Sequence, residues 1–470
     1  MSPIRIQPRT SGTQQQQIQQ QIQPTVQFQG GYELKEHEMR KKAMELLRNP
    51  NMMTIILDEY NRYCYGERDL LEFLHIICTA RYVRGQWVHI SGMSRGGKDT
   101  VARTVFERFP KEDIMMALRF TEHGLEYSGK EDIVDLDGKI IYVSESKGLK
   151  AALDTLRPLY GQKGNTFTTY TVDTSKGAKG KQLKLKGCPV LINTSVIPSM
   201  SEETTKRFWL VSIDESEQQT KGVQALEKYK RSHPSEYNHK SETMEIIEKA
   251  LTLYPKNVSV FIPFADFISF PSNKVRYRGD LDKFLDFIES VAYTYMFQRN
   301  WIKVGDKIIV IANREDFNIA KRILSKFFTP TLMDLPEFIA EFYKTIEERL
   351  KNAETGGGLT VKEIVRLTNK SDETVRSYMK ELRKAGLVSS ERRAGINYYY
   401  LSFEPLDTQT INNITLNCNT KEVKKRILEE IKAYLEKGVE VIYRQVIPDQ
   451  EPKEFTMSKE VVEKLLSKYD

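Results

Sequence analysis

Residues 87–100 have the sequence WVHISGMSRGGKDT, in which the apolar run Trp87–Ser91 precedes a glycine-rich turn. The segment from Gly92 to Lys98 matches the pattern G-x-x-x-x-G-K placed between a strand and a helix. Glycines in this pattern let backbone N–H groups turn toward phosphates, the helix N-terminus adds partial positive charge, and the lysine reaches the terminal phosphates. We therefore predict a phosphate-binding loop that follows a buried strand.

The loop departs from the usual pattern at Asp99, which stands where Ser or Thr normally supplies a hydroxyl to magnesium. Thr100 is the next hydroxyl available to a phosphate oxygen. A glycine-rich turn without a ligand is the alternative, and the flanking strand and helix make it the weaker one. We expect ATP and Mg²⁺ as cofactors, and the predicted nucleotide-binding residues are Gly92, Ser94, Gly96, Gly97, Lys98, Asp99 and Thr100.

A second strand end with acidic character is expected for the metal and the attacking water, and the run Lys139–Val143 followed by Ser144 and Glu145 suits it best. Glu145 is predicted to orient or activate water. Ser144 occupies the position usually held by Asp, so we hypothesise that Asp99 and Ser144 have exchanged the carboxylate and the hydroxyl that flank the metal. The alternative is two unrelated substitutions in a site that binds nucleotide and hydrolyses it poorly.

Two further strands follow, Pro189–Thr194 and Phe208–Ile213, and their alternation with helical segments indicates a mostly parallel sheet in an α/β domain. Asn193 ends the first of them and is predicted to sense the γ-phosphate or water. Arg207, just before the second, is predicted to stabilise charge on the nucleotide of a neighbouring subunit. A turn residue and a surface ion pair are the plainer alternatives for these two side chains.

A lysine-rich hairpin is predicted between these strands. The β-prone run Thr166–Asp173 and the return run Gln182–Lys186 flank a Gly/Lys segment that contains no acidic residue. We place Lys176, Lys179 and Lys181 at its tip, where they are expected to contact a DNA phosphate backbone inside a ring pore. A solvated lysine loop is the alternative.

Residues 359–402 are predicted to form a winged helix. A short helix over 360–367 and a helix capped by Ser371 precede two strands, 387–390 and 396–401, around a wing at 391–395. The second helix has a buried stripe and a basic face, as a recognition helix requires. The predicted stripe is Val375, Met379 and Leu382, and the predicted DNA contacts are Arg376, Lys380 and Arg383 on the helix with Arg392 and Arg393 on the wing. Some winged helices bind only protein.

The fold class predicted for the 470 residues is an α/β P-loop core with flanking helical regions and a C-terminal winged helix. We divide the chain into a glutamine-rich disordered tail (1–31), a helical N-terminal region (32–85), the P-loop core (86–220), a further helical region broken by a short strand at 307–311 (221–353), the winged helix (354–405) and a helical C-terminal region (406–470). Consecutive glycines at 356–358 mark the expected joint before the winged helix.

Composition excludes several classes of protein. No apolar run approaches the roughly 18 residues of a membrane span, so we expect no membrane partner. The four cysteines are scattered without metal-ligand spacing, which favours a reducing, cytoplasmic location and argues against a zinc site. The formal net charge of +7 is compatible with a polyanionic partner and modest for this length.

The order of these motifs resembles the AAA+ helicase module of plasmid, phage and integrative-element primase-helicases, close to superfamily 3. The resemblance covers about residues 43–328. It is carried by residues 46–50, the P-loop, Val143-Ser144-Glu145, the hairpin, residues 191–194, Arg207 with residues 212–219, and residues 276–299. It implies a homo-oligomeric ring, usually a hexamer, that threads single-stranded DNA past the hairpin, with Arg207 acting between subunits. Because only a helical region and the glutamine-rich tail precede the P-loop here, we expect no primer synthesis.

Three functions remain open at this point. The first is an ATP-dependent helicase or replication-initiator ATPase of a mobile element, with duplex DNA on the winged helix. The second is a DNA-binding regulator that a degenerate ATPase switches without motor activity. The third and weakest is a nucleotide kinase, because Gly-Gly-Lys-Asp-Thr resembles the P-loop of some deoxynucleotide monophosphate kinases, although those enzymes need neither a lysine hairpin nor a winged helix.

Overall fold

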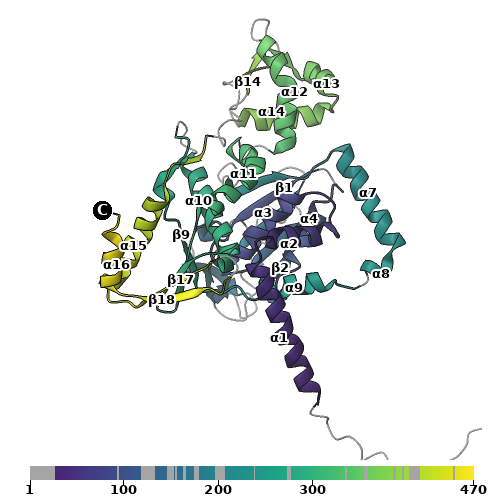
Figure 1. Ribbon diagram of the computed structural model, residues 1–470. Helices are drawn as coiled ribbons and strands as arrows, with labels where there is room; N and C mark the ends of the chain where they lie inside the picture. The colour runs from purple at the N-terminus through teal and green to yellow at the C-terminus, as the bar shows by residue number, and fades with distance from the viewer. Residues whose placement is uncertain are drawn as a thin grey trace, which may run out of the picture.

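A computed structural model gives the arrangement of the chain. It describes residues 27–92, 95–117, 133–144, 153, 156–161, 166–173, 179–195, 207–237, 239–272, 277–333, 336–353, 358–384, 388–393, 396–401, 413–447 and 450–469. Figure 1 shows a central α/β body, a smaller unit built around α12 and α14 above it, and the C-terminal helices at its left side. Residues 1–26 of the predicted tail lie outside the described residues, and a helix begins at Gln27.

A five-stranded sheet forms the centre of the body, in the order β2-β4-β7-β1-β8, and all neighbouring strands in it are parallel. The strands are β1 (Trp87–Ser91), β2 (Ile114–Ala117), β4 (Ile140–Ser144), β7 (Val190–Ser195) and β8 (Phe208–Ser212). Four of them lie at the predicted positions to within one residue. Because the strands are parallel, their carboxyl ends meet at one edge, and the turn after β1 lies there.

Alternate side chains of these strands pack on opposite faces of the sheet, as a period of two requires. In β4, Ile140 and Tyr142 belong to one hydrophobic core, and Ile141 and Val143 belong to the other. Both faces are covered, which explains why the strands are almost continuously apolar.

Helices from both sides of the P-loop sequence share the larger of these cores. The helices α1, α2 and α3, with α9, α10 and α11 from much later in the chain, all contribute buried side chains to it. Their bounds are α1 (Gln27–Arg48), α2 (Met52–Asn61), α3 (Arg68–Thr79), α4 (Lys98–Phe106), α9 (Glu242–Leu251), α10 (Tyr277–Thr294) and α11 (Arg314–Met333). Short 3₁₀ helices lie at Ala80–Tyr82, Lys111–Asp113, Arg157–Leu159, Ala265–Phe267 and Met296–Gln298. The N-terminal helices are therefore part of the body.

Helix α7 (Glu217–Ser232) and the short α8 (Pro234–Tyr237) lie along one side of the body, at the right in Figure 1. Neither helix contains a buried residue. Gln219 Nε2 donates to the carbonyl of Tyr65 at 2.7 Å, and Lys230 Nζ donates to that of Tyr63 at 2.8 Å. These polar contacts attach α7 to the loop that follows α2.

The predicted hairpin is present in a three-stranded sheet of order β3-β6-β5, formed by β3 (Ile133–Asp135), β5 (Thr166–Asp173) and β6 (Lys179–Lys186). The antiparallel ladder of β5 and β6 extends from Thr166 opposite Lys186 to Asp173 opposite Lys179. The prediction that Lys179 and Lys181 lie at the tip was wrong, because the return strand begins at Lys179. Lys176 and the turn lie outside the described residues.

A second sheet lies in the regions on either side of the predicted winged helix, which were expected to be helical apart from the strand at 307–311. It has the order β18-β17-β11-β12-β9, with β9 (Val258–Phe261), β11 (Trp301–Val304), β12 (Lys307–Ile311), β17 (Val441–Gln445) and β18 (Lys453–Met457). Helices α15 (Thr420–Glu436) and α16 (Lys459–Leu466) pack on it in one core. A further pair joins β10 (Ile268–Ser269) to β16 (Thr415–Leu416). The helical prediction for 406–470 is corrected accordingly, since β17 and β18 of this segment complete the sheet through the pairing of β17 with β11.

The segment between these parts forms a unit of its own, which we call the α12–β15 unit (residues 336–401). It contains α12 (Glu337–Ala353), β13 (Leu359–Thr360), α13 (Val361–Thr368), α14 (Asp372–Lys384), β14 (Val388–Arg393) and β15 (Ile396–Leu401). Its sheet has the order β13-β15-β14. The predicted stripe of α14 is buried, and it shares one core with Ile339 and Ile346 of α12. The boundary predicted at residue 354 is therefore too late, because α12 belongs to this core.

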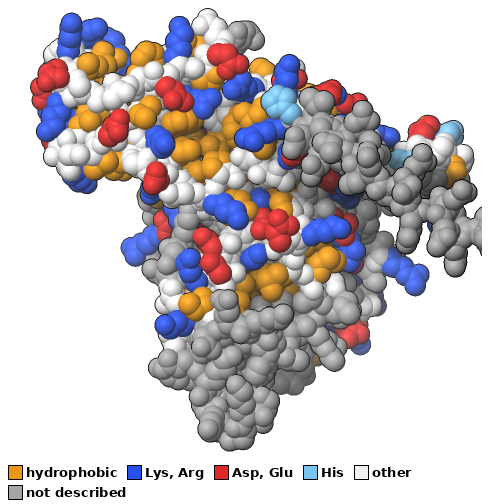
Figure 2. Space-filling model, turned by 90° about the horizontal axis from the view of Figure 1, so that it is seen from below, with side chains coloured by type: hydrophobic (Ala, Val, Ile, Leu, Met, Phe, Trp, Pro, Cys, Tyr) orange, Lys and Arg blue, Asp and Glu red, His pale blue; other side chains and the backbone are white. Residues whose placement is uncertain are grey.

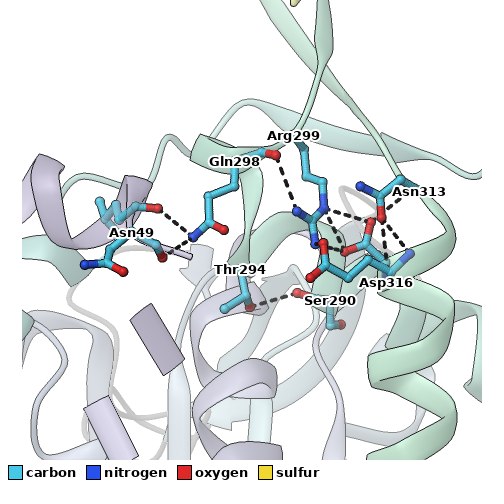
Figure 3. A network of polar contacts seen from close by, with 9 residues as sticks. Asn49, Ser290, Thr294, Gln298, Arg299, Asn313 and Asp316 are labelled. Carbon is cyan, nitrogen blue, oxygen red and sulfur yellow. Dashed lines mark hydrogen bonds and ion pairs between the residues drawn. The ribbon is translucent and has the colours of Figure 1, made fainter. Parts of the chain in front are cut away.

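Polar side chains of the segment after α10 contact both the end of α1 and helix α11 (Figure 3). The Arg299 guanidinium donates to both carboxylate oxygens of Asp316 at 2.8 to 3.1 Å, and both side chains are almost fully buried. Gln298 Nε2 donates to the carbonyls of Leu47 and Asn49 at the end of α1. The Gln298 bonds thus connect the segment after α10 to the N-terminal helices, and the ion pair fixes that segment on α11.

Among the described residues, no helix has the length and apolar character to cross a membrane, and no cluster of three His, Cys, Asp or Glu side chains is arranged to hold a metal ion. Cys64, Cys78 and Cys188 are buried free thiols, and Cys418 is half-buried and free.

Candidate functional site

A turn that contains Gly92 and Gly97 joins β1 to α4, and its residues 93–94 lie outside the described residues. Gly97 has a φ of 98°, and Arg95 also adopts a positive φ, of 65°. A Cβ at Gly92 would lie 2.6 Å from Cγ1 of Ile213, so only glycine fits at that position. Lys98, the first residue of α4, is buried and donates from Nζ to the carbonyl of Gly92 at 2.8 Å.

The surroundings of Lys98 favour the release of its proton relative to free lysine. Burial lowers the pKa of its ammonium group, and the nearby carboxylates of Asp99 and Glu215 oppose that shift. A bound polyphosphate would add negative charge beside Nζ and further favour the charged form. The lysine is thus placed for anion binding at the N-terminus of α4.

Asp99 is hydrogen-bonded into the sheet. Its Oδ1 accepts from the Tyr142 hydroxyl of β4 at 2.6 Å and from Thr194 Oγ1 of β7 at 2.7 Å. Burial raises the pKa of Tyr142 far above its ordinary value, with the bond to Asp99 as a further cause, so the tyrosine stays an O–H donor. The side chain of Asp99 is in this way fixed by β7, which neighbours β1, and by β4, the next strand in the sheet.

Ser144 lies at the same edge of the sheet as Asp99. It is the last residue of β4, and it stands opposite Thr194 in the parallel register of β4 and β7. The site therefore offers a carboxylate with hydroxyl groups around it, an oxygen-rich donor set that suits Mg²⁺. Glu145 and Ser94 lie outside the described residues. The exchange of metal ligands between Asp99 and Ser144 stays a prediction.

Asn193 is fully buried between β1 and β4. Its Nδ2 donates to the carbonyl of Val143 at 2.8 Å, which leaves Oδ1 to accept from Nδ1 of His89 at 2.7 Å. Nε2 of His89 then accepts from the Ser195 hydroxyl at 3.2 Å. Burial lowers the pKa of His89 to about 4, with nearby Lys98 as a lesser cause acting in the same direction, so the ring is neutral at pH 7. The predicted sensor is thus held by a neutral histidine from the P-loop strand.

Arg207 lies at the opposite edge of the sheet from the P-loop. It precedes Phe208, which is opposite Trp87 at the start of β1, whereas Gly92 follows the end of that strand. The five residues of β1 separate the level of Arg207 from the level of Gly92, which is roughly 16 Å at about 3.3 Å per residue. Arg207 is half-buried and lies near Tyr160. Within one chain it is therefore remote from its own P-loop.

The predicted DNA-binding side chains are described in part. On α14, Arg376, Lys380 and Arg383 are exposed. The Arg376 guanidinium donates to Asp372 one turn earlier, and Arg383 donates to Ser390 Oγ on β14 at 3.0 Å. The side chains of Lys179, Lys181, Arg392 and Arg393 lie outside the described set, although their strands are described.

Positive charge is not gathered on the face seen in Figure 2, where the described Lys and Arg side chains are interspersed with Asp and Glu. The net charge of the chain thus tells little about where a polyanion would bind. Specific groups, namely the hairpin and α14, remain the predicted contacts.

Comparison with known proteins identifies part of the chain. Residues 36–254 match the MTBMA_p00010 P-loop domain family. The match runs from α1 to just beyond α9 and includes Lys98, so this segment is a P-loop domain of the nucleoside triphosphate-binding class. No curated protein matches the chain.

The P-loop domain also contains site residues for which the sequence predicted no role. Tyr142 and Thr194 hold Asp99, His89 holds Asn193, and Ser195 in turn holds His89. In the sequence these four residues stand out only as polar side chains inside strands that are otherwise apolar. A hydroxyl or an imidazole in a buried strand needs a hydrogen-bond partner, so this polarity indicates that a partner exists. Which partner it finds depends on the strand order.

Proposed function

We propose that the protein is an ATP-dependent DNA helicase or replication-initiator ATPase of a mobile genetic element, and that it translocates on DNA as a homo-oligomeric ring, expected to be a hexamer. The observation that carries this proposal is the arrangement of the P-loop sheet. The P-loop follows the strand between β7 and β8, the β5–β6 hairpin is inserted between β4 and β7, and Arg207 lies at the far edge. An AAA+-like core of this kind needs a neighbouring copy to bring an arginine to its nucleotide.

In this mechanism Lys98 and the N-terminus of α4 bind the β- and γ-phosphates. Asp99 and Ser144 would hold Mg²⁺, which neutralises phosphate charge when bound. Glu145 orients the attacking water, and Asn193 senses the γ-phosphate. Hydrolysis then moves the β5–β6 hairpin, whose lysines hold single-stranded DNA in the pore.

We further propose that the α12–β15 unit is a winged helix that holds duplex DNA. Its elements follow the order helix, strand, helix, helix, strand, strand. Helix α14 would enter the major groove. The bond from Arg376 to Asp372 fixes the guanidinium before DNA arrives, and Lys380 and Arg383 extend the basic face by one and two further turns.

ATP hydrolysis by the purified chain, measured with and without single-stranded DNA, tests the enzymatic part. Lys98→Ala should abolish turnover, and wild-type turnover should rise with DNA. An Asp99→Ser/Ser144→Asp double variant should retain more activity than either single variant if the metal ligands are exchanged. If the losses of activity in the two single variants add in the double variant, the hypothesis of exchanged metal ligands is wrong.

The trans action of Arg207 is tested by mixing two inactive variants, Lys98→Ala and Arg207→Ala. In mixed rings about a quarter of the interfaces combine an intact lysine with an intact arginine, since each heterologous interface takes one side from each chain. A mixture that regains activity supports the ring. A mixture that stays as inactive as its two parts contradicts it.

The second candidate is an ATP-switched DNA-binding regulator. The hydrogen bonds that Tyr142 and Thr194 make to Asp99 favour it, because they occupy one oxygen of the carboxylate that replaces the usual hydroxyl. Nucleotide binding with slow turnover that DNA leaves unchanged, and a monomer in mass photometry with ATP and DNA, would select the regulator over the motor.

A further inference from the structure

A pocket of about 580 Å³ opens beside the P-loop, and the motifs of the sequence do not account for it. Its walls are residues 67–70 at the start of α3, Gly92 of the P-loop, residues 212–216 after β8, Lys326 of α11, and two residues of α12, Phe338 and Glu341. Its volume lies in the range of sites for small organic ligands. The α12–β15 unit therefore forms one wall of a pocket that begins at the phosphate-binding loop.

The charges of this pocket show which part of a ligand it suits. Five of its lining side chains are acidic and two are basic. One of the basic groups, Arg68, donates to Asp58 at 2.7 Å, and the other, Lys326, lies 3.8 Å from Asp69. Negative potential of this kind repels phosphate. A nucleoside, by contrast, brings hydroxyl and amine donors for carboxylates.

Phe338 supplies an aromatic surface to the pocket. Its ring centroid lies 5.4 Å from that of Tyr378 on α14, and Tyr378 also contacts Phe342 edge-on at 5.1 Å. Phe338 is half-buried and packs against the core of the α12–β15 unit. A flat heterocycle stacked on this ring would touch the P-loop domain and the α12–β15 unit together.

We propose that this pocket binds the nucleoside part of the nucleotide whose phosphates lie on the P-loop, with the base on Phe338. The assignment rests on the proposed nucleotide binding and adds to it the contact that distinguishes ATP from inorganic polyphosphate, the ring of Phe338. Gly92 is the point where the two halves of the ligand meet. Because the ligand bridges both parts, bound nucleotide holds the α12–β15 unit against the end of β8.

Calorimetric titration of the full chain with ATP and with inorganic tripolyphosphate tests this assignment. Loss of a stacked base weakens binding by about 5- to 100-fold, so Phe338→Ala should lose ATP affinity by such a factor and keep its affinity for tripolyphosphate. Phe338→Trp should keep both. Lys98→Ala should lose both ligands. Phe455→Ala is the matched control, since Phe455 is an exposed aromatic on β18.

Amide hydrogen exchange of the wild-type chain tests the same contact without any substitution. ATP should protect amides of α12 around residues 337–345, and tripolyphosphate should leave them unchanged. ATP binding by Phe338→Ala at wild-type affinity, or α12 exchange that ATP leaves unaltered, would overturn the pocket assignment while nucleotide binding stands. A wild-type chain that binds no ATP would overturn both.

Discussion

The buried His89 predicts a specific loss of stability in acid. It lies fully inside the sheet, where Nδ1 donates to Asn193 and Nε2 accepts from Ser195. In a His89→Gln variant the amide group can donate to the first partner and accept from the second. The substitution thus keeps the hydrogen bonds and removes the titrating ring, at a packing cost of about 1 kcal/mol at pH 7.

The magnitude follows from the lowered pKa. The ring has a pKa of about 4 in the fold against an ordinary value of 6.5. Between these values the unfolded chain binds a proton that the folded chain does not, so the free energy of unfolding falls as the pH drops through this window. Linkage gives a loss of about 2 kcal/mol at pH 5 relative to pH 7 and about 3 kcal/mol below pH 4. No discount for solvent applies, because the side chain is fully buried.

Urea unfolding at pH 7 and pH 5, followed by tryptophan fluorescence, measures the loss. In a Trp301→Phe background the signal comes from Trp87 and Trp209, which both lie in the central sheet. His89→Gln should lose about 2 kcal/mol less than its parent between the two pH values. His233→Gln, which changes an exposed ring, should match the parent. An equal pH-dependent loss in His89→Gln and its parent would refute the reasoning.

Three other substitutions test further contacts. Arg299→Ala leaves the buried Asp316 carboxylate without its partner and should cost about 3 to 5 kcal/mol in urea unfolding, and adding Asp316→Asn should recover part of it. Gly92→Ala places a Cβ 2.6 Å from Ile213 at a φ of 156°, so ATP affinity in calorimetry should fall, and Ile213→Ala in the same chain should recover only the part that is due to the clash. Burial raises the pKa of Asp286 to about 6, which means that its ionised form costs stability above that pH. Asp286→Asn should therefore gain up to about 1 kcal/mol at pH 8, after allowance for solvent screening, and nothing at pH 4, as thermal unfolding at both pH values would show.

The central sheet was predictable because its strands are buried on both faces. Continuous apolar runs such as Trp87–Ser91 need no partner to be recognised, and the glycine-rich turn after them is local as well. The same holds for the cap of α14, where Ser371 Oγ accepts from the backbone N–H of Thr374 at 3.2 Å. Features that depend only on residues close together in the sequence can therefore be predicted from one sequence.

The second sheet was not predictable, since its pairing joins distant segments. Asn300 Nδ2 donates to the Tyr443 hydroxyl, 143 residues further along the chain. The segment that contains β17 and β18 is rich in Lys and Glu, and this composition favoured a helical prediction. The partners of Asp99 were missed for a related reason, because Tyr142 and Thr194 reach it only after the order β4-β7-β1 is known.

The pairing of β11 with β17 also determines when the second sheet can be completed during synthesis of the chain. About 140 residues separate β11 from β17 in the sequence. Because ribosomes add about 5 to 20 residues per second, the edge of β11 stays without its partner for roughly 7 to 30 s. The α12–β15 unit emerges in that interval with a core of its own and can fold first. Until β17 arrives, the N–H and C=O groups on that edge of β11 lack their strand partner and are open to pairing with any other strand.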